Sequence, residues 1–266
     1  MAGRSGTALV LDVDSGRVLA QYRPDVAARR LVRPGSAIKP FTLLALLNSG
    51  RVKPEQPVVC RRELRLAGHK LDCSHPQMAQ PMTAVTALAY SCNSYFAQMA
   101  ALLTDAELNQ SLMRAGLTAM TNLVDGEVAG VIRSPGGVEQ RQLLALGEEN
   151  IRITPLELLA AYRRLALMRK QPAASPALQA VFDGLEGSAT YGMGRLAQVS
   201  GLEVAGKTGT ASAEGGWTYA WFAGYAPAKS PQVVLVIFLE RGGGGLDAAP
   251  IAGEVLSAFA AAQSSR

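Results

Sequence analysis

Apolar residues along this chain follow two different spacings, one near its ends and another through its middle. Near the N-terminus, apolar runs at residues 7–13 and 17–22 flank the turn-forming sequence Asp-Ser-Gly at 14–16, which predicts a β-hairpin. In the last third of the chain, runs of the same kind predict three more strands, at residues 204–211, 219–226 and 232–239. An alanine-rich helix is expected to follow them.

Helical spacing dominates between residues 82 and 185. Thr104 with Glu107, and Thr154 with Glu157, each match the capping box, in which a hydroxyl and a carboxylate bind free backbone N–H groups of the first turn. Both pairs therefore predict where a helix begins.

An earlier helix is expected over about residues 36–49, directly after the chain-breaking pair Pro34-Gly35. Pro40 fits this helix only in its first turn, where a missing N–H group costs little. Ser36 is therefore placed at or just before the helix N-terminus.

Strands at both ends and helices between them predict an α+β fold. We expect a mostly antiparallel sheet built from both chain ends with flanking helices, and a helical subdomain inserted in the middle. The sheet lobe would comprise about residues 1–35 and 187–266 and the mainly helical lobe about 50–186, with the helix at 36–49 between them. Clefts commonly form where two such lobes meet.

The composition is that of a globular protein, with 266 residues, 48% of them hydrophobic and 18% charged. The net charge of +5 would attract anions, but the arginines are scattered in pairs such as Arg61-Arg62 rather than gathered in a basic run. Nucleic acid is therefore not expected as a partner. No apolar stretch reaches transmembrane length, and no apolar segment precedes the first expected strand, so neither a spanning segment nor a signal peptide is expected in these residues. The protein is then either cytosolic or exported by a segment that this sequence does not include.

Three cysteines leave several possibilities open. Cys60 and Cys73 flank a polar, hairpin-like stretch, whereas Cys92 lies in an apolar segment. In an exported protein, a disulfide between Cys60 and Cys73 ranks first and free thiols second. A zinc site formed by Cys60, His69, Cys73 and His75 ranks third, because this spacing matches none of the common zinc patterns.

Candidate catalytic chemistry begins with the sequence Ser36-x-x-Lys39. Residues three apart share a helix face, so the lysine can reach the serine hydroxyl and take its proton. Desolvation or a second cation would lower the pKa of Lys39 enough for this role, and Lys207 could be that cation. The backbone N–H groups of a helix N-terminus suit a developing oxyanion. Taken alone, the pair could equally be a capping serine and a surface lysine.

Ser91-Cys92-Asn93 places two polar side chains inside a strongly apolar segment. Buried polar groups need partners, and a catalytic Ser–Lys pair would supply them. The competing interpretation of Ser91 and Asn93 is a helix cap in a loop.

Lys207-Thr208-Gly209-Thr210 falls in an expected strand but lacks the apolar residues of a central strand. Gly209 would let a substrate backbone lie close to the strand, and the hydroxyls of Thr208 and Thr210 would share one face. An edge strand protected by a lysine would explain Lys207 but not the Gly-Thr pair.

In this order the three motifs resemble those of penicillin-binding protein transpeptidase domains, within the serine D,D-peptidase and β-lactamase-like superfamily. The flanking sequences Arg33-Pro34-Gly35 and Ala205-Gly206, and the segment at residues 220–227, are similar as well. The resemblance covers nearly the whole chain and implies a single transpeptidase-like catalytic domain over residues 1–266.

The resemblance implies a peptidoglycan D,D-transpeptidase without a metal or other cofactor. Ser36 would attack the penultimate D-Ala carbonyl of a stem peptide, with Lys39 as base and Ser91 relaying a proton to the leaving amine. Asn93 would position substrate, Lys207 would polarise the site, and Thr208 and Thr210 would bind the terminal carboxylate. The N–H groups of Ser36 and Thr210 would form the oxyanion hole, and β-lactams would acylate Ser36.

The resemblance also implies partners and a location. Stem peptides and β-lactam antibiotics are the expected ligands, and other cell-wall synthesis proteins are possible partners. The protein would act outside the cytoplasm, in the periplasm or on the outer face of the inner membrane. An export or anchor segment absent from this chain would take it there.

One segment departs from the family pattern. Many relatives carry Gly-Gln-Gly before the Thr-Pro helix, whereas this chain has Gly147-Glu148-Glu149-Asn150. A glutamate here raises the alternative of a β-lactamase, but the Glu-x-x-Leu-Asn pattern of class A enzymes is missing. A D,D-carboxypeptidase ranks closest to the transpeptidase, followed by a β-lactam-sensing receptor domain and then a β-lactamase. A structural domain without activity would have no reason to keep Ser36, Lys39 and Lys207 together.

Overall fold

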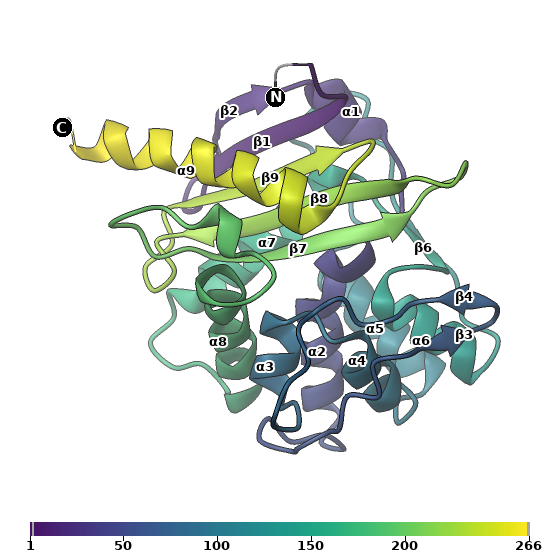
Figure 1. The fold of residues 1–266 in the computed structure, drawn as a ribbon. Helices are drawn as coiled ribbons and strands as arrows, with labels where there is room; N and C mark the ends of the chain where they lie inside the picture. The colour runs from purple at the N-terminus through teal and green to yellow at the C-terminus, as the bar shows by residue number, and fades with distance from the viewer. Residues whose placement is uncertain (2, 265–266) are drawn as a thin grey trace.

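The fold of a computed structural model joins a twisted sheet to a cluster of helices (Figure 1). The structure describes residues 1 and 3–264. The strands are β1 (Gly6–Asp12), β2 (Val18–Tyr22), β3 (Arg65–Leu66), β4 (His69–Lys70), β5 (Val131–Ile132), β6 (Ile151–Arg152), β7 (Ala205–Ser212), β8 (Thr218–Ala226) and β9 (Val233–Leu239). The α-helices are α1 (Pro24–Arg29), α2 (Lys39–Asn48), α3 (Ala84–Ala89), α4 (Asn93–Ala100), α5 (Asp105–Arg114), α6 (Val138–Leu146), α7 (Pro155–Arg169), α8 (Pro176–Thr190) and α9 (Ala249–Ser264). Short helices of other pitch lie at Gly35–Ile38 (η1), Arg195–Ala197 (η2) and Gly244–Ala248 (η3).

The main sheet has five strands in the order β2-β1-β9-β8-β7, and every neighbouring pair is antiparallel. The two chain ends meet where β1 pairs with β9. This arrangement confirms the predicted α+β fold with an antiparallel sheet from both ends. It also makes β7, the strand with the Lys-Thr-Gly motif, an edge strand.

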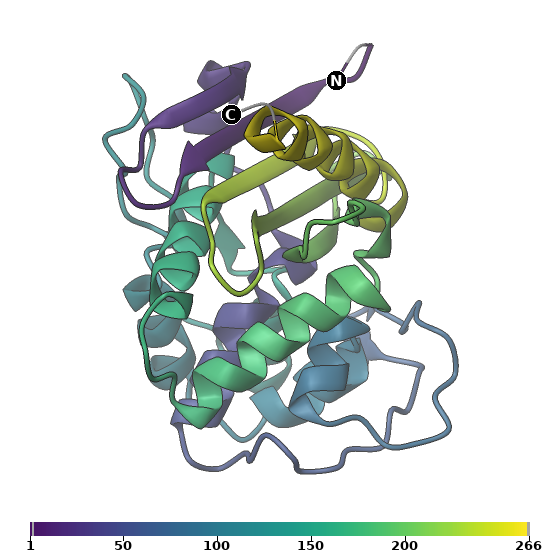
Figure 2. The same cartoon turned by 90° about the vertical axis from the view of Figure 1, so that its left-hand side faces the viewer.

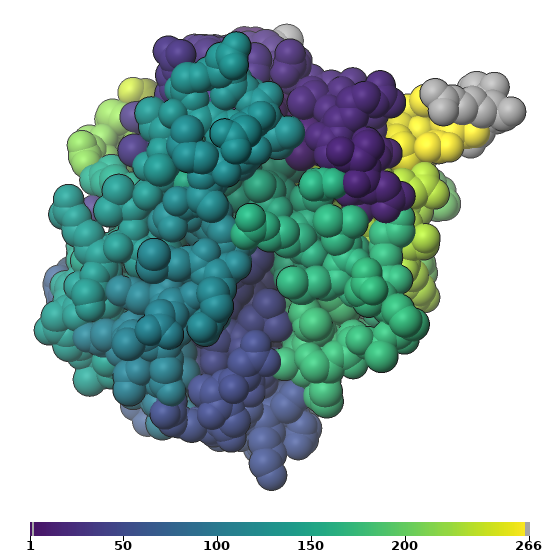
Figure 3. All heavy atoms as spheres, turned by 180° about the vertical axis from the view of Figure 1, so that it is seen from behind, coloured from purple at the N-terminus to yellow at the C-terminus, as the bar shows by residue number. Residues whose placement is uncertain are grey.

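Helices cover both faces of the sheet. In Figures 1 and 2, α9 lies along one face, and α7 packs against the other. Strand β9 is therefore buried on both sides, which its uninterrupted apolar sequence Val-Val-Leu-Val-Ile-Phe-Leu makes favourable. Seen from behind, residues from the middle of the chain cover most of the surface below the N-terminal hairpin (Figure 3).

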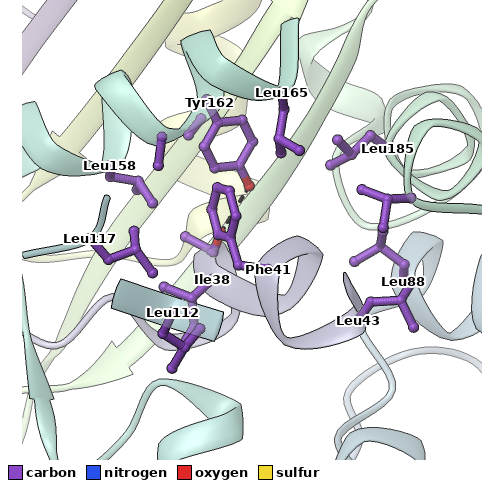
Figure 4. Close-up of a cluster of buried hydrophobic side chains, with 14 of the residues drawn as sticks. Ile38, Phe41, Leu43, Leu88, Leu112, Leu117, Leu158, Tyr162, Leu165 and Leu185 are labelled. Atoms are coloured by element: carbon purple, nitrogen blue, oxygen red, sulfur yellow. Dashed lines mark hydrogen bonds between the residues drawn. The ribbon is translucent and has the colours of Figure 1, made fainter. Parts of the chain in front are cut away.

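Helix α2 is the centre of the helix cluster and is buried along nearly its whole length. Its side chains Phe41 and Leu43 contact a core formed by several helices (Figure 4). Phe41 meets Tyr162 of α7 edge-to-face, with ring centroids 5.5 Å apart. The core thereby joins α2 firmly to the helix that supports the sheet.

Both predicted capping boxes are present, at Thr104 with Glu107 before α5 and at Thr154 with Glu157 before α7. The helix predicted from Ser36 begins differently. Ser36 lies in the 3₁₀ turn η1, and the α-helix starts at Lys39 with Pro40 in its first turn. No helix among residues 1 and 3–264 combines the length and the apolar character needed to cross a membrane.

Candidate active site

Ser36 lies on the short turn η1, which is held from three sides. Gly35 has φ of 51°, and its N–H donates to Gly147 O at 3.0 Å. A Cβ on Gly35 would lie 2.6 Å from Thr210 O, so only glycine allows β7 to approach this closely. From helix α7, the hydroxyl of Tyr162 donates to Ala37 O at 2.8 Å (Figure 4). The turn is thus fixed while Ser36 itself remains half-buried.

Lys39 is fully buried beneath this turn. Its ammonium donates to the Ser91 carbonyl at 2.8 Å, to the Ser91 hydroxyl at 3.3 Å and to Asn93 Oδ1 at 2.6 Å. Burial lowers its pKa to about 8, because desolvation disfavours the charged form. Among the described residues, its hydrogen bonds go to Ser91 and Asn93 rather than to Ser36; such catalytic contacts often tighten only when substrate binds.

Ser91 links the two lysines of the site. It joins α3 to α4 with φ of 57°, a left-handed conformation that is costly for a residue with a side chain. This conformation directs its hydroxyl between Lys39 and Lys207, which donates to it at 2.8 Å. Asn93 is anchored from the other side, because its Nδ2 donates to Leu71 O at 3.0 Å.

Lys207 is also fully buried, and its Nζ donates to Thr208 O at 2.9 Å. Burial lowers the pKa of Lys207 well below its ordinary value, and the charge of Lys39 lowers it further. Two ammonium groups that share one hydroxyl disfavour each other's charge. The arrangement therefore favours a neutral amine next to the Ser36 turn, as a general base requires.

The outer edge of β7 presents backbone groups to this region. At the end of the β7–β8 hairpin, Ala213 N donates to Trp217 O, whereas Ser212 N donates away from the sheet to Glu148. Because N–H directions alternate along a strand, Thr210 N also points to the outer edge. This is the side on which Ser36 lies, so the geometry provides a second N–H group for an oxyanion.

Gly209 serves a purpose that the sequence did not indicate. A Cβ at this position would lie 2.7 Å from Pro34 O and 3.0 Å from Ala37 N. The space is filled by the Ser36 turn itself, so the glycine first of all allows strand and turn to touch. Thr208 and Thr210 occupy the face opposite Lys207, where Thr210 Oγ1 accepts the N–H of Gly244 at 3.0 Å.

The connector after α6 contributes Glu148, whose role the sequence left open. Its side chain is buried and accepts Ser212 N at 3.2 Å, so it binds the open edge of β7. Burial raises the pKa of this carboxyl, although the backbone bond from Ser212 and the charge of Arg33 oppose the shift. Sequence patterns gave no sign of either this contact or the Tyr162 hydrogen bond, since both join segments far apart in the chain.

The cysteines do not follow the first-ranked expectation. Cys60 Sγ and Cys73 Sγ are 3.6 Å apart, and all three cysteines are free, so the expected disulfide is wrong. His69 is wrong as a companion of the thiols, because its Nε2 pairs with Glu149 Oε1 at 2.8 Å. Cys92 takes its place, with Sγ 3.8 Å from Cys73 Sγ.

Comparison with known proteins gives matches over nearly the whole chain. The family described as penicillin binding protein transpeptidase domain matches residues 6–257. The chain is 27% identical over 300 residues to the peptidoglycan D,D-transpeptidase FtsI of Escherichia coli K12, covering 95% of this chain and 50% of the relative. It is 24% identical over 302 residues to the probable peptidoglycan D,D-transpeptidase PenA of Neisseria flavescens, covering 96% of this chain and 74% of the relative. The chain thus spans about half the length of several curated relatives that it matches.

Solved structures share the fold. The D,D-transpeptidase domain of a peptidoglycan glycosyltransferase from Eggerthella lenta superposes with a TM-score of 0.80 at 23% identity, covering 98% of this chain and 79% of that one. Pseudomonas aeruginosa PBP2, solved in complex with WCK 5153, superposes with a TM-score of 0.82 at 23% identity, covering 97% of this chain and 71% of that one. With the family match over nearly its whole length, the chain belongs to the penicillin-binding protein transpeptidase domain family.

Proposed function

We propose that this chain is the catalytic domain of a peptidoglycan D,D-transpeptidase, in which Ser36 forms an acyl-enzyme. The observation that carries the proposal is the convergence of Lys39 and Lys207 on the hydroxyl of Ser91, directly beneath the Ser36 turn. The named relatives support the choice of peptidoglycan as substrate.

The acylation step follows from the placement of these groups. Neutral Lys39 takes the proton of Ser36, whose oxygen bonds to the penultimate D-Ala carbonyl carbon of a stem peptide. The N–H groups of Ser36 and Thr210 bind the oxyanion of the tetrahedral intermediate. When the C–N bond breaks, Ser91 passes a proton to the leaving amine and is reprotonated by a lysine, so that D-Ala departs as a neutral amine.

Deacylation runs along the same path in reverse. The amine of a second stem peptide attacks the ester carbonyl, gives up a proton through Ser91 and Lys39, and releases Ser36. Asn93 and Thr208 would position substrate, and Thr208 with Thr210 would bind its terminal carboxylate. A β-lactam follows the first step, but its amine stays tethered to the acyl group and blocks the second.

The proposal extends to the setting of the protein. Residues 1–266 would act as one catalytic domain outside the cytoplasm. A segment beyond this chain would anchor or export it, and cell-wall synthesis proteins would be its partners. No metal or cofactor takes part in these acyl-transfer steps.

The test is acylation by a fluorescent penicillin, followed by intact mass over time. Wild type should gain one penicillin per chain and keep it, whereas Ser36→Ala should gain none. Ser200→Ala is the matched control, because it removes an exposed serine hydroxyl that is not one of the site residues and should label like wild type. Turnover of a D-Ala-D-Ala peptide with an added amine acceptor then separates transpeptidation from hydrolysis. Absence of an adduct on folded wild type would refute the proposal, and rapid release of hydrolysed penicillin would indicate a β-lactamase.

A further inference from the structure

Next to the active site, three thiols and an imidazole from the segment at residues 60–92 meet at one point. They belong to Cys60, Cys73, His75 and Cys92, and their Sγ and ring nitrogen atoms all lie within 4.8 Å of one another. The latter three are buried, and Cys60 is half-buried. The reactions proposed above use none of these groups.

The spacing of these atoms is that of a tetrahedral metal site. With zinc–sulfur bonds of about 2.3 Å and zinc–nitrogen bonds of about 2.0 Å, tetrahedral geometry places two sulfurs about 3.8 Å apart and a sulfur and a nitrogen about 3.5 Å apart. The observed separations are 3.6 Å for Cys60 Sγ to Cys73 Sγ and 3.8 Å for Cys73 Sγ to Cys92 Sγ. Cys60 Sγ lies 3.6 Å from His75 Nε2.

The surroundings orient these groups as ligands. The Nδ1–H of His75 donates to Pro76 O at 2.7 Å, which leaves the lone pair of Nε2 directed at the sulfurs. Backbone N–H groups at the start of α4 donate to two of the sulfurs, Ser94 N to Cys73 at 3.3 Å and Tyr95 N to Cys92 at 3.4 Å. Such N–H···S bonds stabilise thiolates.

A cation also stands next to the cluster. Arg62 donates to the carbonyl of His75 at 2.9 Å and to that of Cys73 at 3.3 Å, which holds its guanidinium against the loop that carries the ligands. Three thiolates and one divalent ion carry a net charge of −1, and this guanidinium would balance it.

We propose that Cys60, Cys73, His75 and Cys92 bind one structural Zn²⁺. Soft thiolates with one imidazole in tetrahedral array favour zinc among the common divalent ions, and four protein ligands leave no open position for substrate. This set differs from the one suggested by the sequence, which had His69 in place of Cys92.

The site connects the long loop between α2 and α3 to the catalytic motif. In Figure 1 this loop runs past α3 and α4 to the β3–β4 hairpin, and its regular structure within the described chain is limited to those two-residue strands. Because this loop has so little secondary structure, few backbone hydrogen bonds hold it in place. A bound zinc ion would crosslink it instead. Because Cys92 lies between Ser91 and Asn93, the metal would act as a positioning group for both of their side chains.

Metal content of the intact chain tests the proposal without any use of activity. Protein prepared without chelators should contain one zinc per chain, and Cys92→Ser and His75→Ala should each lose it. The matched control is His69→Ala, which removes the histidine paired with Glu149 and should keep the zinc. Cobalt exchanged into wild type should give the strong ligand-field bands and the thiolate charge-transfer band of a tetrahedral, sulfur-rich site.

Other outcomes would overturn the inference. If folded wild type takes up neither zinc nor cobalt from excess metal, the cluster consists only of packed free thiols, and the proposal is refuted. A mass lower by two hydrogens under non-reducing conditions would instead indicate an oxidised Cys60–Cys73 pair. If a variant fails to fold, thiol titration of native wild type decides the matter: a chelator should expose three thiols that zinc protects, and equal thiol reactivity with and without chelator would refute the site.

Discussion

Removing the hydroxyl of Tyr162 tests how much one buried hydrogen bond contributes to the fixed position of the Ser36 turn. Tyr162 lies in the core of the helix cluster, and its hydroxyl donates to Ala37 O at 2.8 Å. Tyr162→Phe keeps the ring and its packing on Phe41 but leaves that carbonyl without this donor. A buried group deprived of its partner costs about 1–3 kcal/mol. For a chain of this size, each kcal/mol corresponds to about 2–4 °C in Tm.

The turn should also lose its fixed position, because Ala37 follows Ser36 directly. A displacement of about 1 Å at a reacting group can cost about 100-fold in rate. We expect the second-order rate constant for penicillin acylation to fall by about 10- to 100-fold, measured by fluorescent labelling at limiting penicillin concentration.

Tyr225 supplies the matched control for this experiment. It is a second fully buried tyrosine, but its hydroxyl has no hydrogen-bond partner among the described residues. Tyr225→Phe therefore removes an unsatisfied polar group and should leave Tm unchanged or raise it, with normal acylation. Equal behaviour of the two variants would refute the reasoning, because it would mean that the bond to Ala37 contributes nothing.

Three further experiments test Lys39 as the base, Gly209 as the contact of β7 with the Ser36 turn, and the buried carboxyl of Glu148. Burial lowers the pKa of Lys39 to about 8, and its neutral amine is the proposed base. Acylation should therefore accelerate about tenfold per pH unit below pH 8 and level off above it, and a rate that is flat from pH 6 to 9 would exclude this base. Gly209→Ala should push β7 away from the Ser36 turn. The free energy of unfolding from chemical denaturation should fall by about 1–3 kcal/mol, and most of the acylation should be lost. Gly136→Ala, which has open space around the added Cβ, should behave like wild type. Glu148→Gln keeps an oxygen that can accept the N–H of Ser212 but removes a buried carboxyl. The Tm should therefore stay the same or rise, and acylation should be retained. An acylation rate that falls more than tenfold would give the carboxyl a chemical role.

Local patterns predicted the parts of this fold that depend on local physics. The hairpin at β1 and β2, the capping boxes before α5 and α7 and the buried strand β9 each follow from residues close together in the chain. The antiparallel sheet followed from their order. These features need no knowledge of which surfaces meet.

Contacts between distant segments could not be obtained this way. The sequence indicated that Ser91 should face a Ser–Lys pair, both from its polar side chain in an apolar segment and from the resemblance to a family, but it gave no geometry for the contact. The pairing of His69 with Glu149 and the approach of Cys92 to Cys73 depend on how the long loop folds back over α4. The sequence places those two cysteines on opposite sides of helix α3, so a pattern of spacings had no means of joining them.

The backbone at Ser91 shows what the site costs the fold. Its φ of 57° belongs to the left-handed region, where a side chain costs about 1–2 kcal/mol and glycine costs little. The proposed function requires the side chain there, because its hydroxyl is the acceptor that both lysines share.

Two variants of this residue separate backbone strain from chemistry. Ser91→Ala and Ser91→Gly both remove the hydroxyl. The acylation rate of both variants should fall equally, by at least about 100-fold relative to wild type, which is the usual size of general acid–base effects. The glycine variant also relieves the backbone, so it should be about 1 kcal/mol more stable than the alanine variant in chemical denaturation. Replacing alanine by glycine elsewhere usually destabilises a protein, so this order of stabilities would be specific to the left-handed conformation. The reverse order would show that Ser91 is unstrained in solution and that its position is set by the residues around it.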